Sequence, residues 1–165
     1  MPAPRRPSPT SVWPTGKSPE IAGILAERAQ SLANSPGRQS LLLLGHGPNS
    51  AEDYAAWMSN LRPIADTART GFRSVTVELV RDDAPPPVRA EAVARVRELI
   101  TLQHELTRKP VVVVPVLVAS GQISRQKLPR DLEGLPIVYS GEALLPHAGM
   151  ARWVEARVEQ LDSTP

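Results

Sequence analysis

The sequence predicts an α/β fold, a four-stranded parallel sheet with helices on both faces. Its 165 residues suffice for one ordinary domain, and 41% of them are apolar. Four short apolar runs alternate with longer stretches in which apolar residues recur at helical spacing. Apolar runs without a polar face are typical of strands buried on both sides, and the alternation implies right-handed crossovers between parallel strands. We therefore predict a flavodoxin-like sheet, preceded by one N-terminal helix.

Two segments precede the predicted sheet. Residues 1–17 contain five prolines and few large apolar residues, so we expect a disordered tail there. Ser18 and Pro19 resemble a helix N-cap followed by proline at the first helical position, and they predict a helix from about residue 19 to residue 33. The expected boundaries are 1–17 for the tail, 18–38 for the N-terminal helix and 39–165 for the α/β domain.

Four strands and three further helices are predicted along the rest of the chain. The first strand is the run Leu41–Leu44, and the third is Val111–Val118, in which Pro115 lacks a hydrogen-bond donor and predicts a bulge or bend. Ser50, with Asp53 three residues later, predicts the N-cap of the helix after the first strand. The spacing further predicts strands at 75–80 and 137–139, and helices that end near residues 68, 104 and 161.

Composition excludes several kinds of site. Because the chain has no cysteine, disulfides, thiolate metal sites and cysteine catalysis are excluded, and any metal must use histidine, carboxylate or amide ligands. The sequence pI is about 9.4, but Arg5, Arg6 and Lys17 precede the first acidic residue and leave the rest of the chain near neutral. A near-neutral body with 4% aromatic residues argues against nucleic-acid binding. No apolar run approaches membrane-spanning length, and we expect a cytoplasmic protein with no membrane partner.

The candidate site lies where two of the strands end. Gly45-His46-Gly47 directly follows the first strand, and a long loop that carries three cations, 119–130, follows the third. In flavodoxin-like order these two loops border one crevice at the C-terminal edge of the sheet, where ligands of such folds bind. Glycine on both sides of His46 would let a large ligand approach the imidazole closely.

Other polar side chains follow the remaining strands. Asp82 and Asp83 end the second strand and could bind a cation or accept protons, although a solvated acidic turn is the commoner role. His147 lies beyond the C-terminal end of the fourth strand. His104 lies in the last turns of a helix, where a cation suits the helix dipole, and we interpret it as structural.

Three motifs carry a family resemblance. They are Gly45-His46-Gly47 after an apolar strand, a valine-rich strand that leads through Gly121 to Leu128-Pro129, and Leu145-Pro146-His147 before the last helix. Together they resemble the CbiX-type sirohydrochlorin chelatases, which share the ferrochelatase-like fold, over about residues 40–160. The resemblance implies insertion of cobalt, iron or nickel into a tetrapyrrole, with His46 and His147 as metal-binding and catalytic residues.

The chain departs from the family pattern in the loop after the third strand. The family has a second histidine and an aspartate there, and this chain has Ile123 and Lys127 instead. Isoleucine neither binds a metal nor accepts a proton, so His46 would have to act with His147, Gln122 or an acid of the Asp82-Asp83 loop. Cations in this loop suit a polycarboxylated macrocycle. The resemblance implies tetrapyrrole contacts from Ser120, Gly121, Gln122, Arg125 and Lys127.

Two functions follow from these patterns. The first is metal insertion or metal binding in cobalamin or siroheme biosynthesis. The alternative is a non-catalytic chelatase-like module, either a metal or tetrapyrrole carrier or the degenerate half of a two-part chelatase. Flavin binding is disfavoured because the loop after the first strand lacks a Ser/Thr-rich phosphate cradle, and no dinucleotide fingerprint occurs, so we expect neither flavin nor nucleotide.

The N-terminal helix and the last helix are weakly similar. Residues 18–28 align without gaps with residues 147–157, with Ala22 opposite Ala151 and Arg28 opposite Arg157. Either the two helices occupy equivalent places in two half-domains, or the match reflects amphipathic patterning alone. On the first interpretation we expect a homodimer, or pairing with a heterologous chelatase half, in which two His46 edges face one cavity.

Overall fold

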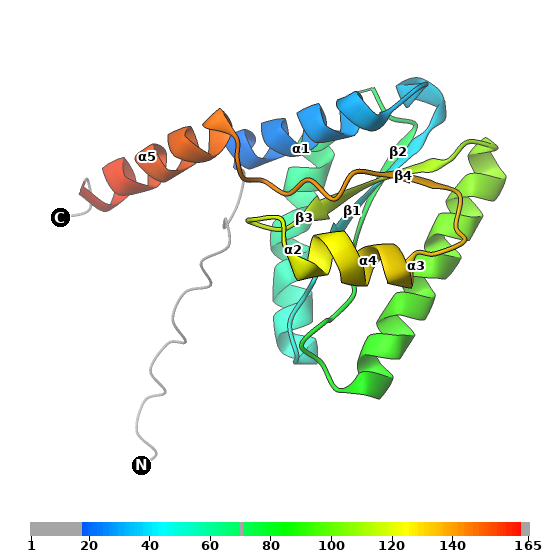
Figure 1. Cartoon of the computed structure of the whole chain (residues 1–165). Helices are drawn as coiled ribbons and strands as arrows, with labels where there is room; N and C mark the ends of the chain where they lie inside the picture. The colour runs from blue at the N-terminus through cyan, green and yellow to red at the C-terminus, as the bar shows by residue number, and fades with distance from the viewer. Residues whose placement is uncertain (1–17, 70, 163–165) are drawn as a thin grey trace, which may run out of the picture.

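The sheet has four parallel strands in the order β2-β1-β3-β4 (Figure 1). The computed structural model describes residues 18–69 and 71–162, so the tail predicted at 1–17 lies outside the described residues. Each strand pairs in parallel with its neighbours, which confirms the predicted α/β class. The strands are β1 (Ser40–Gly45), β2 (Ser74–Leu79), β3 (Val111–Val116) and β4 (Ile137–Tyr139).

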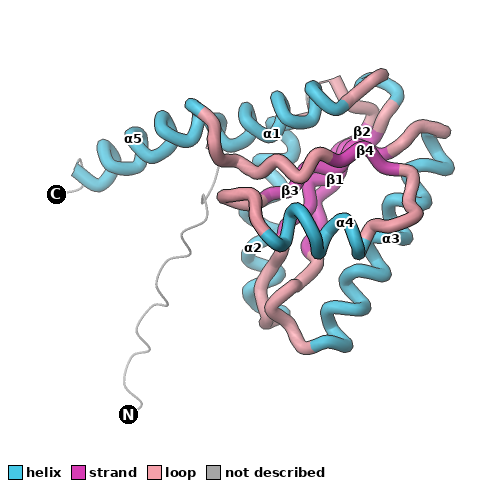
Figure 2. The backbone as a smooth tube through the Cα atoms, viewed as in Figure 1, coloured by secondary structure: helices cyan, strands magenta, loops and turns pink. Residues whose placement is uncertain are grey.

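Helices cover both faces of the sheet (Figure 2). One core cluster joins α1 and α2 to the sheet, and a second joins α3 and the start of α4 to the opposite face. None of the helices in the described ranges combines the length and the apolar character that crossing a bilayer requires. The helices are α1 (Pro19–Leu32), η1 (Pro36–Arg38), α2 (Ala51–Ala68), α3 (Pro86–Thr107), the π-helical η2 (Ile123–Lys127), α4 (Leu128–Asp131) and α5 (Ala148–Asp162).

The all-leucine run of β1 is explained by burial on both faces. Leu41 and Leu43 belong to the cluster with α1 and α2, whereas Leu42 and Leu44 belong to the cluster with α3. None of the four side chains is more than 1% exposed. Since successive side chains of a strand point to opposite faces, a strand covered on both sides favours apolar side chains at consecutive positions.

Pro115 does not produce the predicted bulge. The pairing of β1 with β3 runs in continuous register from Leu41 opposite Val112 to Gly45 opposite Val116, with Pro115 opposite Leu44. The pairing of β3 with β4 ends at Val113. The proline therefore lies beyond the last residue pair that β3 forms with β4.

The segment after β3, which was predicted to be a long loop, is largely helical. Ser124 is fully buried, and its carbonyl accepts a hydrogen bond from the Tyr139 hydroxyl of β4. Burial raises the pKa of Tyr139 to about 12, which keeps this hydroxyl protonated and able to donate. Pro129 lies in the first turn of α4, which follows η2 without a break. Contacts with a distant strand thus stabilise a helix that local sequence did not reveal.

The two capping predictions have different outcomes. Ser50 caps α2 as expected, because its Oγ accepts a hydrogen bond from the Asp53 amide at 3.0 Å. Ser18 precedes α1, but its side chain forms no capping hydrogen bond. Its Oγ instead accepts a hydrogen bond from Arg157 of α5 at 3.3 Å.

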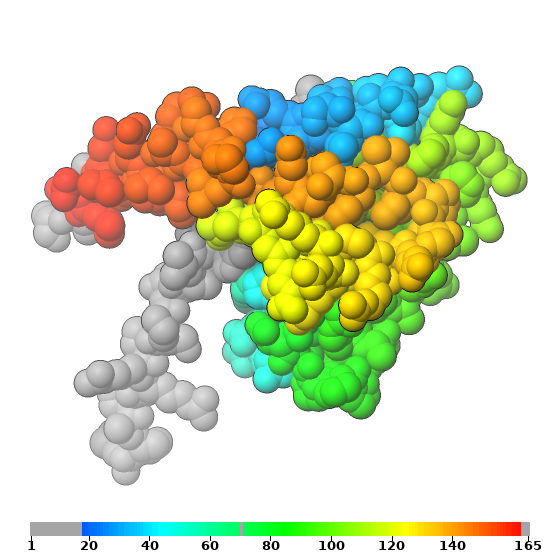
Figure 3. Space-filling model, viewed as in Figure 1, coloured from blue at the N-terminus to red at the C-terminus, as the bar shows by residue number. Residues whose placement is uncertain are grey.

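The similar helices α1 and α5 have different surroundings. Ile21, Ile24 and Leu25 of α1 are at most 1% exposed and pack in one core cluster with α2 and β3. By contrast, α5 packs along α1 and projects beyond the rest of the molecule (Figure 3). Its side chains Val154 and Val158 are about half exposed.

We expect Leu25→Ala to lower the free energy of unfolding by about 3 kcal/mol, because it leaves a cavity in the core. The matched control is Leu106→Ala, since Leu106 is 78% exposed at the end of α3 and its truncation should cost about 0.5 kcal/mol or less. Urea unfolding followed by circular dichroism measures both. Equal losses would show that α1 is not part of the core.

Candidate functional site

His46 follows β1 directly, at the C-terminal edge of the sheet, as predicted. The glycines that flank it are required by close packing against β2. A Cβ on Gly45 would lie 2.6 Å from Leu79 Cδ2, and one on Gly47, where φ is +80°, would lie 2.8 Å from Leu79 Cβ. Both glycines therefore have a structural reason, independent of any ligand.

The imidazole of His46 has few polar contacts. Its Nδ1 is buried without a hydrogen-bond partner in the described part of the chain, and lies 3.8 Å from Asp83 Oδ2. The ring packs edge-on against Trp57, with 5.4 Å between ring centroids. The carboxylate of Asp83 is 69% exposed, so a small movement of this side chain can bring it into hydrogen-bond distance.

His46 lines two cavities that meet at this edge. The small cavity, of about 450 Å³, lies between His46 and the segment after β3, and Gly121, Gln122 and Ile123 line it. The prediction that the loops after β1 and β3 border one crevice is therefore consistent with the structure. Ile123, where the resemblance predicts a second histidine, lines the same small cavity as His46.

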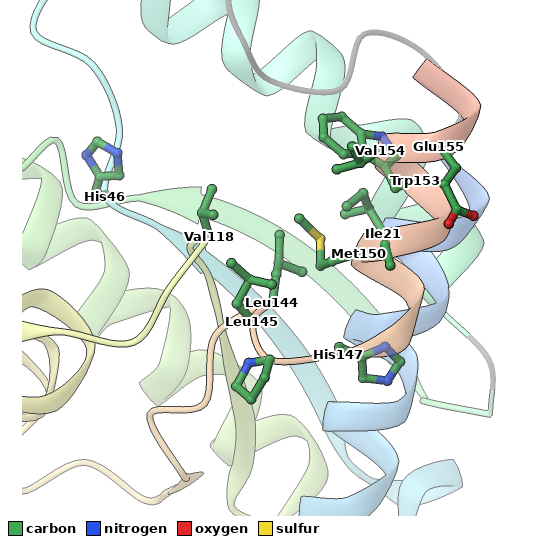
Figure 4. A pocket seen from close by; sticks show the side chains of 12 residues that line it. Ile21, His46, Val118, Leu144, Leu145, His147, Met150, Trp153, Val154 and Glu155 are labelled. Carbon is green, nitrogen blue, oxygen red and sulfur yellow. The ribbon is translucent and has the colours of Figure 1, made fainter. Parts of the chain in front are cut away.

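The large cavity, of about 970 Å³, lies between His46 and α5 (Figure 4). Leu144, Met150 and Val154 contribute to a mostly apolar wall. The indole Nε1 of Trp153 is buried there without a hydrogen-bond partner among the described residues. This wall was not predicted from the sequence, although Met150, Trp153 and Val154 have the spacing of one helix face.

His147 lines the large cavity but performs a capping role. Its Nδ1 accepts a hydrogen bond from the Gly149 amide at 3.0 Å, at the start of α5. Its Nε2 must then carry the proton, and it donates to Glu27 Oε2 of α1 at 2.8 Å. Figure 4 shows the imidazoles of His46 and His147 well apart, with Leu144 between them.

Metal ligation by His147 stays a prediction. With both ring nitrogens in hydrogen bonds, the ring has no lone pair free for a metal, so ligation would require that it leave the Gly149 amide. In residues 18–69 and 71–162, no group of three or more metal-ligating side chains is found.

The expectation of a solvated acidic turn is wrong for Asp82. Its side chain is 5% exposed and accepts hydrogen bonds from Arg89 Nε at 2.9 Å and Lys127 Nζ at 2.7 Å. Burial alone would raise the pKa of Asp82, but the hydrogen bonds from Lys127 and Arg89 outweigh it and lower the pKa. Lys127, predicted to contact a tetrapyrrole, is thus already paired with a carboxylate of the chain.

The other predicted contact residues have three different surroundings. Ser120 has a structural role, because its Oγ donates to the Gly141 carbonyl and accepts from the Ala143 amide, each at 3.0 Å. Gly121 and Gln122 line the small cavity, and Arg125 is exposed on η2.

His104 is structural, as interpreted from sequence. Its Nδ1 lies 2.9 Å from the Lys109 carbonyl oxygen, at the end of α3.

No family model matches the chain, and no curated protein matches it. The site is therefore interpreted from its own geometry.

We expect His147→Ala to lower the free energy of unfolding by about 1 kcal/mol, because the cap of α5 is lost. His147→Asn should recover most of that loss, since asparagine also accepts the N-cap hydrogen bond. Urea unfolding of both variants measures the effect. Equal stability of the two variants would contradict a capping role. Loss of cobalt binding in His147→Asn, as complete as in His46→Ala, would instead establish the predicted ligand role.

Proposed function

We propose that this chain is a chelatase-like protein of tetrapyrrole biosynthesis, in the cobalamin or siroheme route. It binds a tetrapyrrole against His46, and a divalent metal such as cobalt, iron or nickel is a substrate or bound cargo. The observation that carries this proposal is the position of His46, whose imidazole lines an apolar cavity of about 970 Å³ at the C-terminal edge of the sheet. A cavity of this size, with a mostly apolar lining and a few polar groups, is typical of sites for small organic molecules and cofactors.

Metal insertion into a macrocycle requires a group that delivers the metal and a group that accepts the pyrrole protons. A neutral imidazole can serve in either role, since it offers one lone pair near neutral pH. Positive charge that develops on His46 would be stabilised by Asp83, whose carboxylate lies 3.8 Å away. While His147 keeps both of its hydrogen bonds, His46 would have to serve in both roles, which the resemblance divides between two histidines.

One observation favours the non-catalytic alternative, a carrier or the degenerate half of a two-part chelatase. Ile123 lines the small cavity with His46 and presents only an apolar surface where a second base would act. Restoring a histidine there tests this point. Lys127 should be left unchanged in that test, because its ammonium group pairs with Asp82.

We expect Ile123→His to increase the rate of cobalt insertion into sirohydrochlorin by about 100-fold, a modest gain for an added general base. His46→Ala should abolish insertion and metal-dependent binding, and His104→Ala is the matched control, because His104 is remote in sequence and structural. Absorption spectra of sirohydrochlorin with and without cobalt measure both binding and insertion.

Three results have distinct meanings. Binding without insertion by the wild-type chain, with insertion in Ile123→His, supports the non-catalytic alternative. Insertion by wild type that His46→Ala leaves intact contradicts the role of His46. No binding of sirohydrochlorin by wild type contradicts the proposed function.

The proposed partner is a second copy of this chain or a heterologous chelatase half. Leu145, Val154 and Val158 are at least 40% exposed and lie on or next to the projecting α5, where one wall of the large cavity is open to solvent. A partner that packs on α5 would bury these side chains and close the cavity around a macrocycle. Because α1 already covers its own sheet, the partner contact falls on α5.

We expect the wild-type chain to sediment as a dimer at micromolar concentration and Val154→Asp/Val158→Asp to sediment as a monomer, because each aspartate would place a charge in the apolar contact. Leu106→Asp, on the exposed end of α3, is the control and should leave the dimer intact. Sedimentation velocity measures all three. A wild-type monomer that binds sirohydrochlorin tightly would refute the shared cavity, and a monomer that does not bind it would favour a heterologous half.

A further inference from the structure

One buried carboxylate joins the segments that surround His46. Asp82 lies after β2, and its two oxygens accept hydrogen bonds from Arg89 of α3 and Lys127 of η2. Arg89 also pairs with Asp131 of α4, with 2.7 Å between Nη2 and Oδ2. We call Asp82, Arg89, Lys127 and Asp131 the Asp82 clamp.

The clamp also holds the backbone of His46. The amide N–H of Asp82 donates to the His46 carbonyl oxygen at 2.8 Å. Asp82 therefore binds the segment after β1 through its backbone and η2 through its side chain. These are the two segments that face each other across the small cavity, one with His46 and the other with Ile123.

Stability alone is a weak reason for this arrangement. Burying a carboxylate at 5% exposure costs desolvation free energy, and apolar side chains of similar size often stabilise a fold as well as a buried ion pair does. An ion pair, unlike an apolar contact, fixes the relative positions of two segments, because its charge-assisted hydrogen bonds require a specific geometry. Asp82 itself does not line either cavity.

We propose that Asp82 is a positioning residue for the ligand site, and that Lys127 serves this clamp and does not contact the ligand. The clamp fixes the distance between the His46 imidazole and the η2 wall. The identity of the ligand as a tetrapyrrole rests on the proposed function, whereas the Asp82 clamp rests only on the observed contacts.

The experiment compares Asp82→Asn, Lys127→Met and the double variant with wild type. Lys127→Met removes the ammonium group of a partly exposed side chain but keeps an unbranched chain of similar length, and it guards against the case in which Asp82→Asn does not fold. Asp66→Asn is the matched control, because Asp66 is an exposed carboxylate on α2. Two readouts are used: amide hydrogen exchange without ligand, and the Kd for sirohydrochlorin at a temperature where every variant is folded.

We expect amides of η2 and the Asp82 amide to exchange roughly tenfold faster in each single variant, since a charge-assisted hydrogen bond is lost. The double variant should exchange no faster than Asp82→Asn, because both substitutions remove the same pair. The Kd should rise roughly tenfold in both single variants, as for groups that orient a ligand-binding residue.

Faster exchange spread evenly over α3 and β1, or additive effects in the double variant, would overturn the clamp. A localised change in exchange with an unchanged Kd would overturn the positioning role. Failure of wild type to bind sirohydrochlorin would overturn the proposed function and the positioning role together, while the exchange data would still decide whether the clamp exists.

Discussion

Complete burial of β1 is the constraint on which the rest of the structure depends. Helices cover both faces of this strand, so Leu41–Leu44 contribute only to packing. A side chain of this segment that contacts a ligand must therefore follow the end of the strand. His46 is the side chain at that position. The close packing of Gly45 and Gly47 against Leu79 fixes the position of the His46 backbone at the edge of the sheet. The position of the imidazole is therefore a consequence of how closely β1 and β2 pack.

Much of the fold could be predicted from sequence because its signals are local. The apolar runs and helical spacings located β1, β2, β4 and the long helices to within a few residues of their bounds. Prediction failed for 119–130, where helix formation depends on contacts with distant residues. Burial of Ser124 against Tyr139 and the pairing of Lys127 with Asp82 join positions that lie far apart in the sequence.

In the candidate site, too, some features could be predicted from local sequence and others depend on distant contacts. The edge position of His46 was predictable, because parallel strands end together and Gly-His-Gly follows an apolar run. The surroundings of His147 were not, since Glu27 lies 120 positions away and only the packing of α5 on α1 brings the two together. The role of Asp82 was missed for a similar reason: a pair of acidic residues in a turn carries no signal of the two cations that bury one of them.

The similarity of α1 and α5 constrains how a partner can pack. In the gapless alignment Trp153 falls opposite Ile24, and one position beyond the alignment Val158 falls opposite Ala29. Ile24 and Ala29 are at most 1% exposed, so the site that α1 fills has no room for the larger side chains of α5, and overpacking of this kind destabilises a core. In the proposed dimer, α5 is therefore a poor substitute for α1 in the core of a second copy. In the proposed homodimer, α5 would pack on the open side of the large cavity, whereas a proposed heterologous half would have to receive α5 in a wider site than the one α1 occupies here.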